Sequence, residues 1–147
     1  MSGIVVGIDG SGHSRQALEW AMQEAVIRRV PLKVITVHEI GVGYWGSAIA
    51  YPGDHPVAEH ALQAARTEVD KVLGELGEQS PPESVTVQAV SGTPAEELIN
   101  AARDADMLVV GTRGAGGFAR LLLGSVSSQV AHHAHCPVVV VPPEEHS

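Results

Sequence analysis

The sequence contains few aromatic residues, little cysteine and few positive charges. Aromatic residues make up only 3% of its 147 residues. An apolar core must therefore be built from Val, Ile, Leu and Ala, which are typical of buried parallel strands and the helices that cover them. The single cysteine, Cys136, excludes an internal disulfide and a cysteine-based zinc site. No apolar run approaches the roughly 18 residues that a membrane span requires.

The charge balance excludes further classes of protein. Nine basic residues stand against seventeen acidic ones, so the formal net charge is −8. Phosphate backbones and anionic lipids repel such a chain, and we expect no nucleic-acid or membrane partner. The first residues, Met1 to Gly3, lead into an apolar run without a leader of the secretory type, and one cysteine fits a reducing compartment. We therefore expect a cytoplasmic protein.

Short apolar runs alternate with segments of helical periodicity along the whole chain. We expect a single domain, residues 1–147, of the α/β class: one open five-stranded parallel sheet with helices on both faces, a Rossmann-like arrangement. The expected strands are Ile4–Asp9, Leu32–Glu39, Val85–Val90, Met107–Gly111 and Cys136–Val141, and the expected helices run from about Ser14 to Arg29, Val57 to Leu76, Thr93 to Arg103 and Ser125 to Ala134.

Local signals set some of these boundaries. Pro31 is expected to stop the first helix. Thr93, Pro94 and Glu96 have the spacing of a capping box with proline at the first helical position. Residues 40–56 are expected to form a long loop. Its aromatic residues either cover a bound adenine or close the loop over the core; they are Tyr44, Trp45 and Tyr51.

Ligands of open parallel sheets bind beyond the carboxyl ends of the strands, at the point where the strand order reverses. Three segments could line that crevice here: Asp9–Ser14, Val37–Ile40 and Gly111–Ser125. The last of them holds five of the sixteen glycines. Glycines let backbone amides approach an anion, and the start of the next helix offers unpaired N–H groups. A glycine loop without a ligand is the structural alternative.

The crevice segments also carry side chains suited to a nucleotide. Arg113 and Arg120 bring positive charge to the glycine-rich loop, and Ser125 adds a hydroxyl. The carboxylate of Asp9 can accept hydrogen bonds from two ribose hydroxyls. It can also cap the following helix, as can Ser11 and Ser14.

Two familiar phosphate-binding motifs do not explain this loop. A Walker A motif needs a Gly-Lys pair, and the sequence has none. The run from Gly114 to Ala119 formally fits the dinucleotide fingerprint, but it follows the fourth expected strand and no acid lies about 20 residues further on. NAD is therefore a weak alternative ligand.

The pattern Gly111-x2-Gly114-x9-Gly124-Ser125, together with Asp9, resembles the nucleotide-binding class of the universal stress protein family. The likeness covers essentially the whole chain, because the opening run Ile4–Ser14, the end of the second strand at Val37, the run Asp106–Gly114 and the closing run Cys136–Val141 also match. The resemblance implies the fold of adenine nucleotide α-hydrolase-like proteins.

The resemblance also implies a ligand and its site. The ligand would be ATP, with magnesium, or AMP; some family members bind cyclic AMP instead. Adenine would lie near the backbone of Val37, ribose at Asp9, and the phosphates on the amides of Gly111–Gly114 and Gly124–Val126. The full set of expected nucleotide-binding residues is Asp9, Gly10, Ser11, Val37, Gly111, Arg113, Gly114, Gly124, Ser125, Val126 and Ser127.

The sequence around Cys136 contains a second group of possible metal ligands, His132, His133 and His135. Imidazole and thiolate bind zinc well. The spacing is irregular, however, and the cluster falls at a helix-to-strand turn, where histidines are favoured by the helix dipole. A solvated helix end is the better interpretation.

Three classes of function remain open. The first is a regulatory stress-response protein that senses an adenine nucleotide and is not an enzyme, because no base or metal-ligand pair stands out for attack on a γ-phosphate. The second is a weak ATPase or autophosphorylating enzyme in the same pocket. The third is a nucleotide-independent interaction module. Since family members commonly dimerise through the last strand, the resemblance also implies a homodimer formed through Cys136–Val141.

Overall fold

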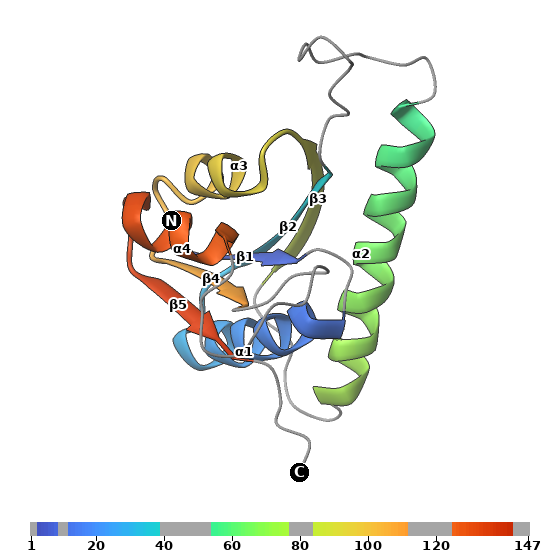
Figure 1. The fold of residues 1–147 in the computed structure, drawn as a ribbon. Helices are drawn as coiled ribbons and strands as arrows, with labels where there is room; N and C mark the ends of the chain where they lie inside the picture. The colour runs from blue at the N-terminus through green and yellow to red at the C-terminus, as the bar shows by residue number, and fades with distance from the viewer. Residues whose placement is uncertain (1–2, 9–11, 39–53, 77–83, 112–124, 143–147) are drawn as a thin grey trace, which may run out of the picture.

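The computed structural model describes residues 3–8, 12–38, 54–76, 84–111 and 125–142, and strands alternate with helices throughout these ranges (Figure 1). The strands are β1 (Ile4–Ile8), β2 (Leu32–His38), β3 (Val85–Ser91), β4 (Met107–Gly111) and β5 (Val138–Val141), and the helices are α1 (Gly12–Arg28), α2 (Asp54–Leu76), α3 (Pro94–Ala101) and α4 (Ser125–His133).

The five strands form one parallel sheet in the order β3-β2-β1-β4-β5. β1 is central, and its first residue, Ile4, pairs with Leu32 of β2 and with Met107 of β4. Helices α1 and α2 cover one face, and α3 and α4 cover the other (Figure 1). The predicted open parallel sheet with helices on both faces is confirmed.

The core is divided between the two faces, because successive residues of a strand point in opposite directions. In β1, Ile4, Val6 and Ile8 pack with α1 and α2, whereas Val5 packs with α3 and α4. The all-apolar strand β4 is buried on both faces. In contrast, β3 lies at an edge, and its inward-facing residues alternate with exposed ones over most of its length. None of the helices described is both long and apolar enough to cross a membrane.

Helix α1 ends one residue earlier than expected, and not at Pro31. Arg29 has a positive φ of 58°. Its N–H donates to the carbonyl of Val26 at 3.3 Å, and the N–H of Val30 donates to the carbonyl of Ala25 at 3.1 Å. These two bonds define a Schellman motif, a helix end that normally places glycine at the left-handed position. The helix has therefore already stopped before the proline.

The start of α3 corrects the predicted capping box. Pro94 does occupy the first turn, and Thr93 has the extended backbone of an N-cap, but its side chain makes no capping hydrogen bond. The side chain of Glu97, not that of Glu96, folds back toward the helix start. A Cβ atom added to Gly92 would lie 2.6 Å from Glu97 Oε1. Gly92 has φ +144°, a conformation that side chains disfavour, so the approach to this helix depends on glycine.

Other boundaries also shift slightly. Helix α2 begins at Asp54, so Pro56 lies in its first turn, where a missing N–H costs little. Strand β5 begins at Val138 and not at Cys136. Pro137, just before β5, has no N–H to donate to the sheet. Its carbonyl nevertheless accepts a hydrogen bond from the N–H of Leu108 at 2.9 Å. Helix α3 ends at Ala101, two residues before the expected Arg103.

Candidate functional site

The order of the strands reverses between β1 and β4. From β1 the chain adds β2 and β3 on one side, and it then crosses to β4 and β5 on the other. Val6 pairs with Val109, so continuing the register puts Ile8 beside Gly111 at the carboxyl edge. Neighbouring strands are roughly 5 Å apart, so the carboxyl ends of β1 and β4 lie side by side. A crevice at this point is where open α/β sheets bind ligands.

Two of the predicted nucleotide-binding residues lie on strands at this edge. Gly111 is the last residue of β4 and pairs with Val141. Val37 is the penultimate residue of β2 and pairs with Val90. Its side chain is half-buried against the α3 and α4 face.

Helix α4 supplies a third predicted part of the site. It begins at Ser125, and its first turn includes Val126 and Ser127 and contains no acidic residue. The first N–H groups of a helix have no partners within it and carry partial positive charge. Ser127 is only 2% exposed, and the residue has an interaction partner in the structure.

The remaining predicted residues lie outside the described residues: Asp9, Gly10, Ser11, Arg113, Gly114 and Gly124, together with Tyr44, Trp45 and Tyr51. The described part of the chain brings Val37, Gly111 and the first turn of α4 to one edge of the sheet. This arrangement can hold an anion with backbone amides and has an apolar strand end beside it.

The histidine cluster and Cys136 lie away from this crevice, because α4 runs back to the opposite edge before β5 begins. His132 Nδ1 lies 2.8 Å from the carbonyl oxygen of Ser128, and the rings of His132 and His133 are tilted, with centroids 6.4 Å apart. Burial, and secondly the nearby carboxylate of Asp106, raise the pKa of the Cys136 thiol. In the described ranges, no three His, Cys, Asp or Glu residues are grouped so as to hold a metal ion.

A model of the universal stress protein family matches residues 1–142. The chain belongs to the universal stress protein family. A universal stress protein of Mycobacterium tuberculosis is 35% identical over 153 residues, an alignment that covers 97% of this chain and 48% of that relative. The chain thus spans about half the length of the curated relatives it matches.

Solved universal stress proteins have the same fold. One solved in complex with cAMP is 26% identical, with a TM-score of 0.67, and the match covers 97% of this chain and 98% of that one. Another, from Archaeoglobus fulgidus in complex with dAMP, is 24% identical, with a TM-score of 0.64, and the match covers 95% of this chain and 97% of that one. At that identity it supports the fold alone. The predicted adenine nucleotide α-hydrolase-like fold is confirmed.

The amino edge of the sheet holds a feature that the sequence reading missed. A hollow lies there, lined by residues at the starts of β1, β2 and β3 and at the end of α3. One signal in the sequence could have drawn attention to it. Lys33 is the only charged residue in the run from Leu32 to Val37, in which Thr36 is the only other polar residue.

Proposed function

We propose that this universal stress protein binds an adenine nucleotide in the crevice between β1 and β4 and acts as a cytoplasmic regulatory sensor, not as an enzyme. The observation that carries the proposal is the reversal of strand order at the two segments that contain the family pattern, after Ile8 and after Gly111. The relative solved with cAMP supports an adenine ligand. ATP with magnesium is our first choice, before AMP and cyclic AMP.

Each part of the site has a role in this proposal. The ribose binds Asp9, and adenine lies against the backbone at Val37. The phosphates bind amides of the loop that starts at Gly111, and they lie at the start of α4. Each such helix-end contact contributes roughly 0.3–1 kcal/mol when exposed and up to about 2 kcal/mol when partly buried, so several must act together. The lack of an acid in the first turn of α4 leaves its positive charge available to the phosphates.

The first experiment is thermal unfolding of nucleotide-stripped protein with Mg-ATP, AMP, cyclic AMP and NAD in parallel. A ligand at about 100 times its Kd adds about 2.7 kcal/mol of stability. For a domain of this size, that is a rise in Tm of roughly 5–10 °C. A selective rise with one adenine nucleotide supports the proposal and names the ligand. No rise with any of them favours the interaction module instead.

A pair of variants tests where the phosphates bind. Gly114→Val fills the space through which a phosphate reaches the loop amides, so we expect nucleotide affinity to fall. Gly117→Val is the matched control, because it places the same side chain in the same loop at a position outside the family pattern. Unchanged affinity in Gly114→Val would overturn the proposed site.

Binding without turnover is the second half of the proposal. It rests on the sequence, in which Asp9 and Glu39 are the only acids expected in the crevice. Because Asp9 is assigned to the ribose, no pair of acids remains to activate a water molecule. We expect phosphate release from Mg-ATP to equal that of a buffer blank. Steady release that disappears in Asp9→Ala would show a weak ATPase, and labelled protein after incubation with γ-labelled ATP would show autophosphorylation.

The edge strand β5 is the proposed site of contact between two copies of the chain. All four of its residues, Val138–Val141, are half-buried, although among the described strands only β4 pairs with β5. An apolar strand of this kind at a sheet edge is a template for pairing with another chain. We expect a homodimer formed through β5. A monomer by light scattering at micromolar concentration would contradict it.

A further inference from the structure

The hollow at the amino edge of the sheet has a volume of about 320 Å³. It lies on the face covered by α3 and α4, beneath the end of α3, at the opposite edge from the nucleotide crevice. Its size is at the lower end of the range of small-molecule sites. Because the two sites lie at opposite edges of the sheet, a nucleotide in the crevice leaves this hollow free.

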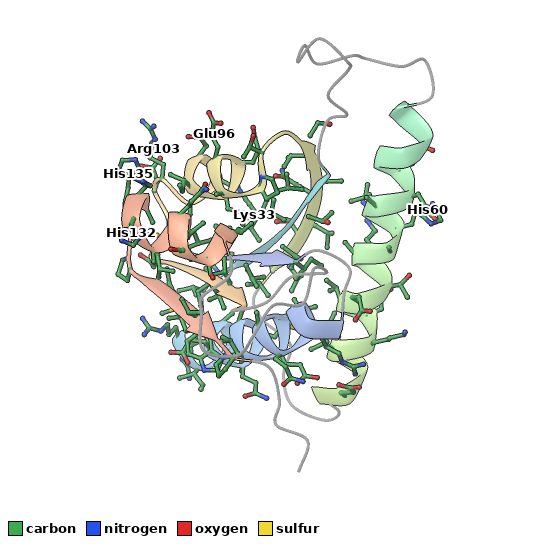
Figure 2. All side chains as sticks on the ribbon, in the orientation of Figure 1. Lys33, His60, Glu96, Arg103, His132 and His135 are labelled. Carbon is green, nitrogen blue, oxygen red and sulfur yellow. The ribbon has the colours of Figure 1, made fainter. Side chains whose placement is uncertain are left out.

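Lys33 is placed unusually for a charged residue. It pairs with Val5 on one side and with Thr86 on the other, in the row of β2 that continues with Ile35 and Val37. Ile35 and Val37 pack into the apolar cluster on this face, whereas Lys33, labelled in Figure 2, is half-buried and lines the hollow. A lysine among apolar neighbours keeps its charge only where the ammonium reaches water or a partner.

The opposite charge lies on the other side of the hollow. Asp104 and Asn100 line it from the end of α3. The last turn of that helix contains no basic residue, so its negative end is not compensated from within. Lys33 and Asp104 make no ion pair within 4.0 Å, with each other or with any other described residue. The hollow thus presents a cation and an anion that do not neutralise each other.

The backbone around the hollow is already hydrogen-bonded. Ile4 N–H donates to the carbonyl of Pro31 at 3.0 Å, Leu32 N–H to that of Ser84 at 2.8 Å, and Asp106 N–H to that of Gly3 at 2.8 Å. The polar groups left to meet a ligand are therefore side chains. They belong to Lys33, Ser84, Thr86, Asn100 and Asp104, and none of them hydrogen-bonds to another side chain in the described ranges.

We propose that this hollow binds a free α-amino acid with an apolar side chain. The carboxylate pairs with the Lys33 ammonium and accepts from the Thr86 hydroxyl. The amino acid's ammonium group pairs with the carboxylate of Asp104 and donates to Oδ1 of the Asn100 side chain, at the negative end of α3. The apolar side chain lies against the lining residues Val5 and Ala105, which belong to the apolar cluster of this face. A zwitterion is favoured because it matches two separated, opposite charges with one small molecule.

The test uses L-leucine as the probe and amide chemical shifts as the readout. We expect shifts at residues 3–5, 31–33 and 100–105 that saturate at millimolar L-leucine. Isoamylamine lacks the carboxylate and isocaproate lacks the ammonium, so both should bind about tenfold more weakly or not at all. No shifts with L-leucine, or equal affinity for the three probes, would overturn the proposal.

Charge-removing variants connect the binding to the named residues. Lys33→Met keeps the aliphatic stem and Asp104→Asn keeps the shape, and each should raise the Kd for L-leucine about tenfold or more. Arg103→Gln is the matched control, because Arg103 is exposed beside Asp104 but does not line the hollow; its Kd should stay within about twofold. If Lys33→Met does not fold, Lys33→Gln replaces it. An unchanged Kd in a folded Lys33 variant would contradict the assignment.

Discussion

At the scale of single residues, Cys136 offers a clean measurement because it is the only cysteine in the chain. Burial, and then the charge of Asp106, raise its pKa above the ordinary value of 9.0. Only the thiolate is nucleophilic. We therefore expect the midpoint of a pH–rate profile for iodoacetamide alkylation to lie above 9.0 in the folded protein and to fall on unfolding in urea.

The raised pKa of Cys136 also makes the stability of the folded protein depend on pH. The unfolded chain releases the Cys136 proton at lower pH than the folded protein, so this contribution to stability is present below the ordinary pKa and is lost as pH rises above it. Asp106→Asn should lower the midpoint of alkylation without bringing it to the unfolded value, because burial is the larger cause. Asp70→Asn, on α2, is the control. A midpoint at or below that of the unfolded chain would contradict this account.

Arg29 is a second residue whose conformation gives a prediction. Its φ of 58° is one that residues with a Cβ adopt at a cost of roughly 1–2 kcal/mol. Arg29→Gly removes that cost, but it also makes the unfolded chain more flexible. We expect a net gain of about 0.5–1 kcal/mol in the free energy of unfolding by urea titration. Arg29→Ala keeps the Cβ and should leave stability nearly unchanged. Equal effects of the two variants would refute the role of the backbone.

At the scale of the elements, Gly74 in α2 and Gly7 in β1 show how one residue type serves different purposes. A Cβ added at Gly74 meets nothing within 4 Å, whereas one added at Gly7 lies 2.7 Å from Cδ1 of Leu98 in α3. Gly74→Ala should therefore stabilise the protein by roughly 0.5–1 kcal/mol, because alanine favours a helix over glycine. Gly7→Ala should destabilise it, because the buried side chain of Leu98 must shift to make room for the new methyl group. Thermal unfolding of both variants checks the pair, and a lower Tm in Gly74→Ala would contradict it.

The order and type of the elements could be predicted from the sequence because period and composition agree along each segment. Strand β4 reads as one apolar run and is buried on both faces, and β3 alternates in sequence and in burial. The ends were harder to predict. Thr93 makes no side-chain capping bond, Glu97 and not Glu96 lies against Gly92, and α1 ends in a Schellman motif built on an arginine. The rotamer of a glutamate and a positive φ at an arginine leave no mark in local residue patterns.

At the scale of the whole molecule, the crevice could be placed from the sequence and the hollow could not. The glycine pattern and Asp9 follow strands, and the rule for open sheets gathers such segments at the carboxyl edge. The structure puts Val37, Gly111 and the start of α4 there. The hollow depends on how the end of α3 lies over the starts of three strands. Lys33 and Asp104 are 71 positions apart, so only the packed fold brings them together.

The central place of β1 has a consequence for amide hydrogen exchange. β1 has a hydrogen-bonded strand on each side, and Val6 is fully buried, so its amides should exchange only when the whole domain opens. Their exchange rate would then report the global free energy of unfolding. The amides of β5 have one described neighbour and should open locally much sooner. If they instead become more protected as the protein concentration rises, the second strand edge is covered by another molecule.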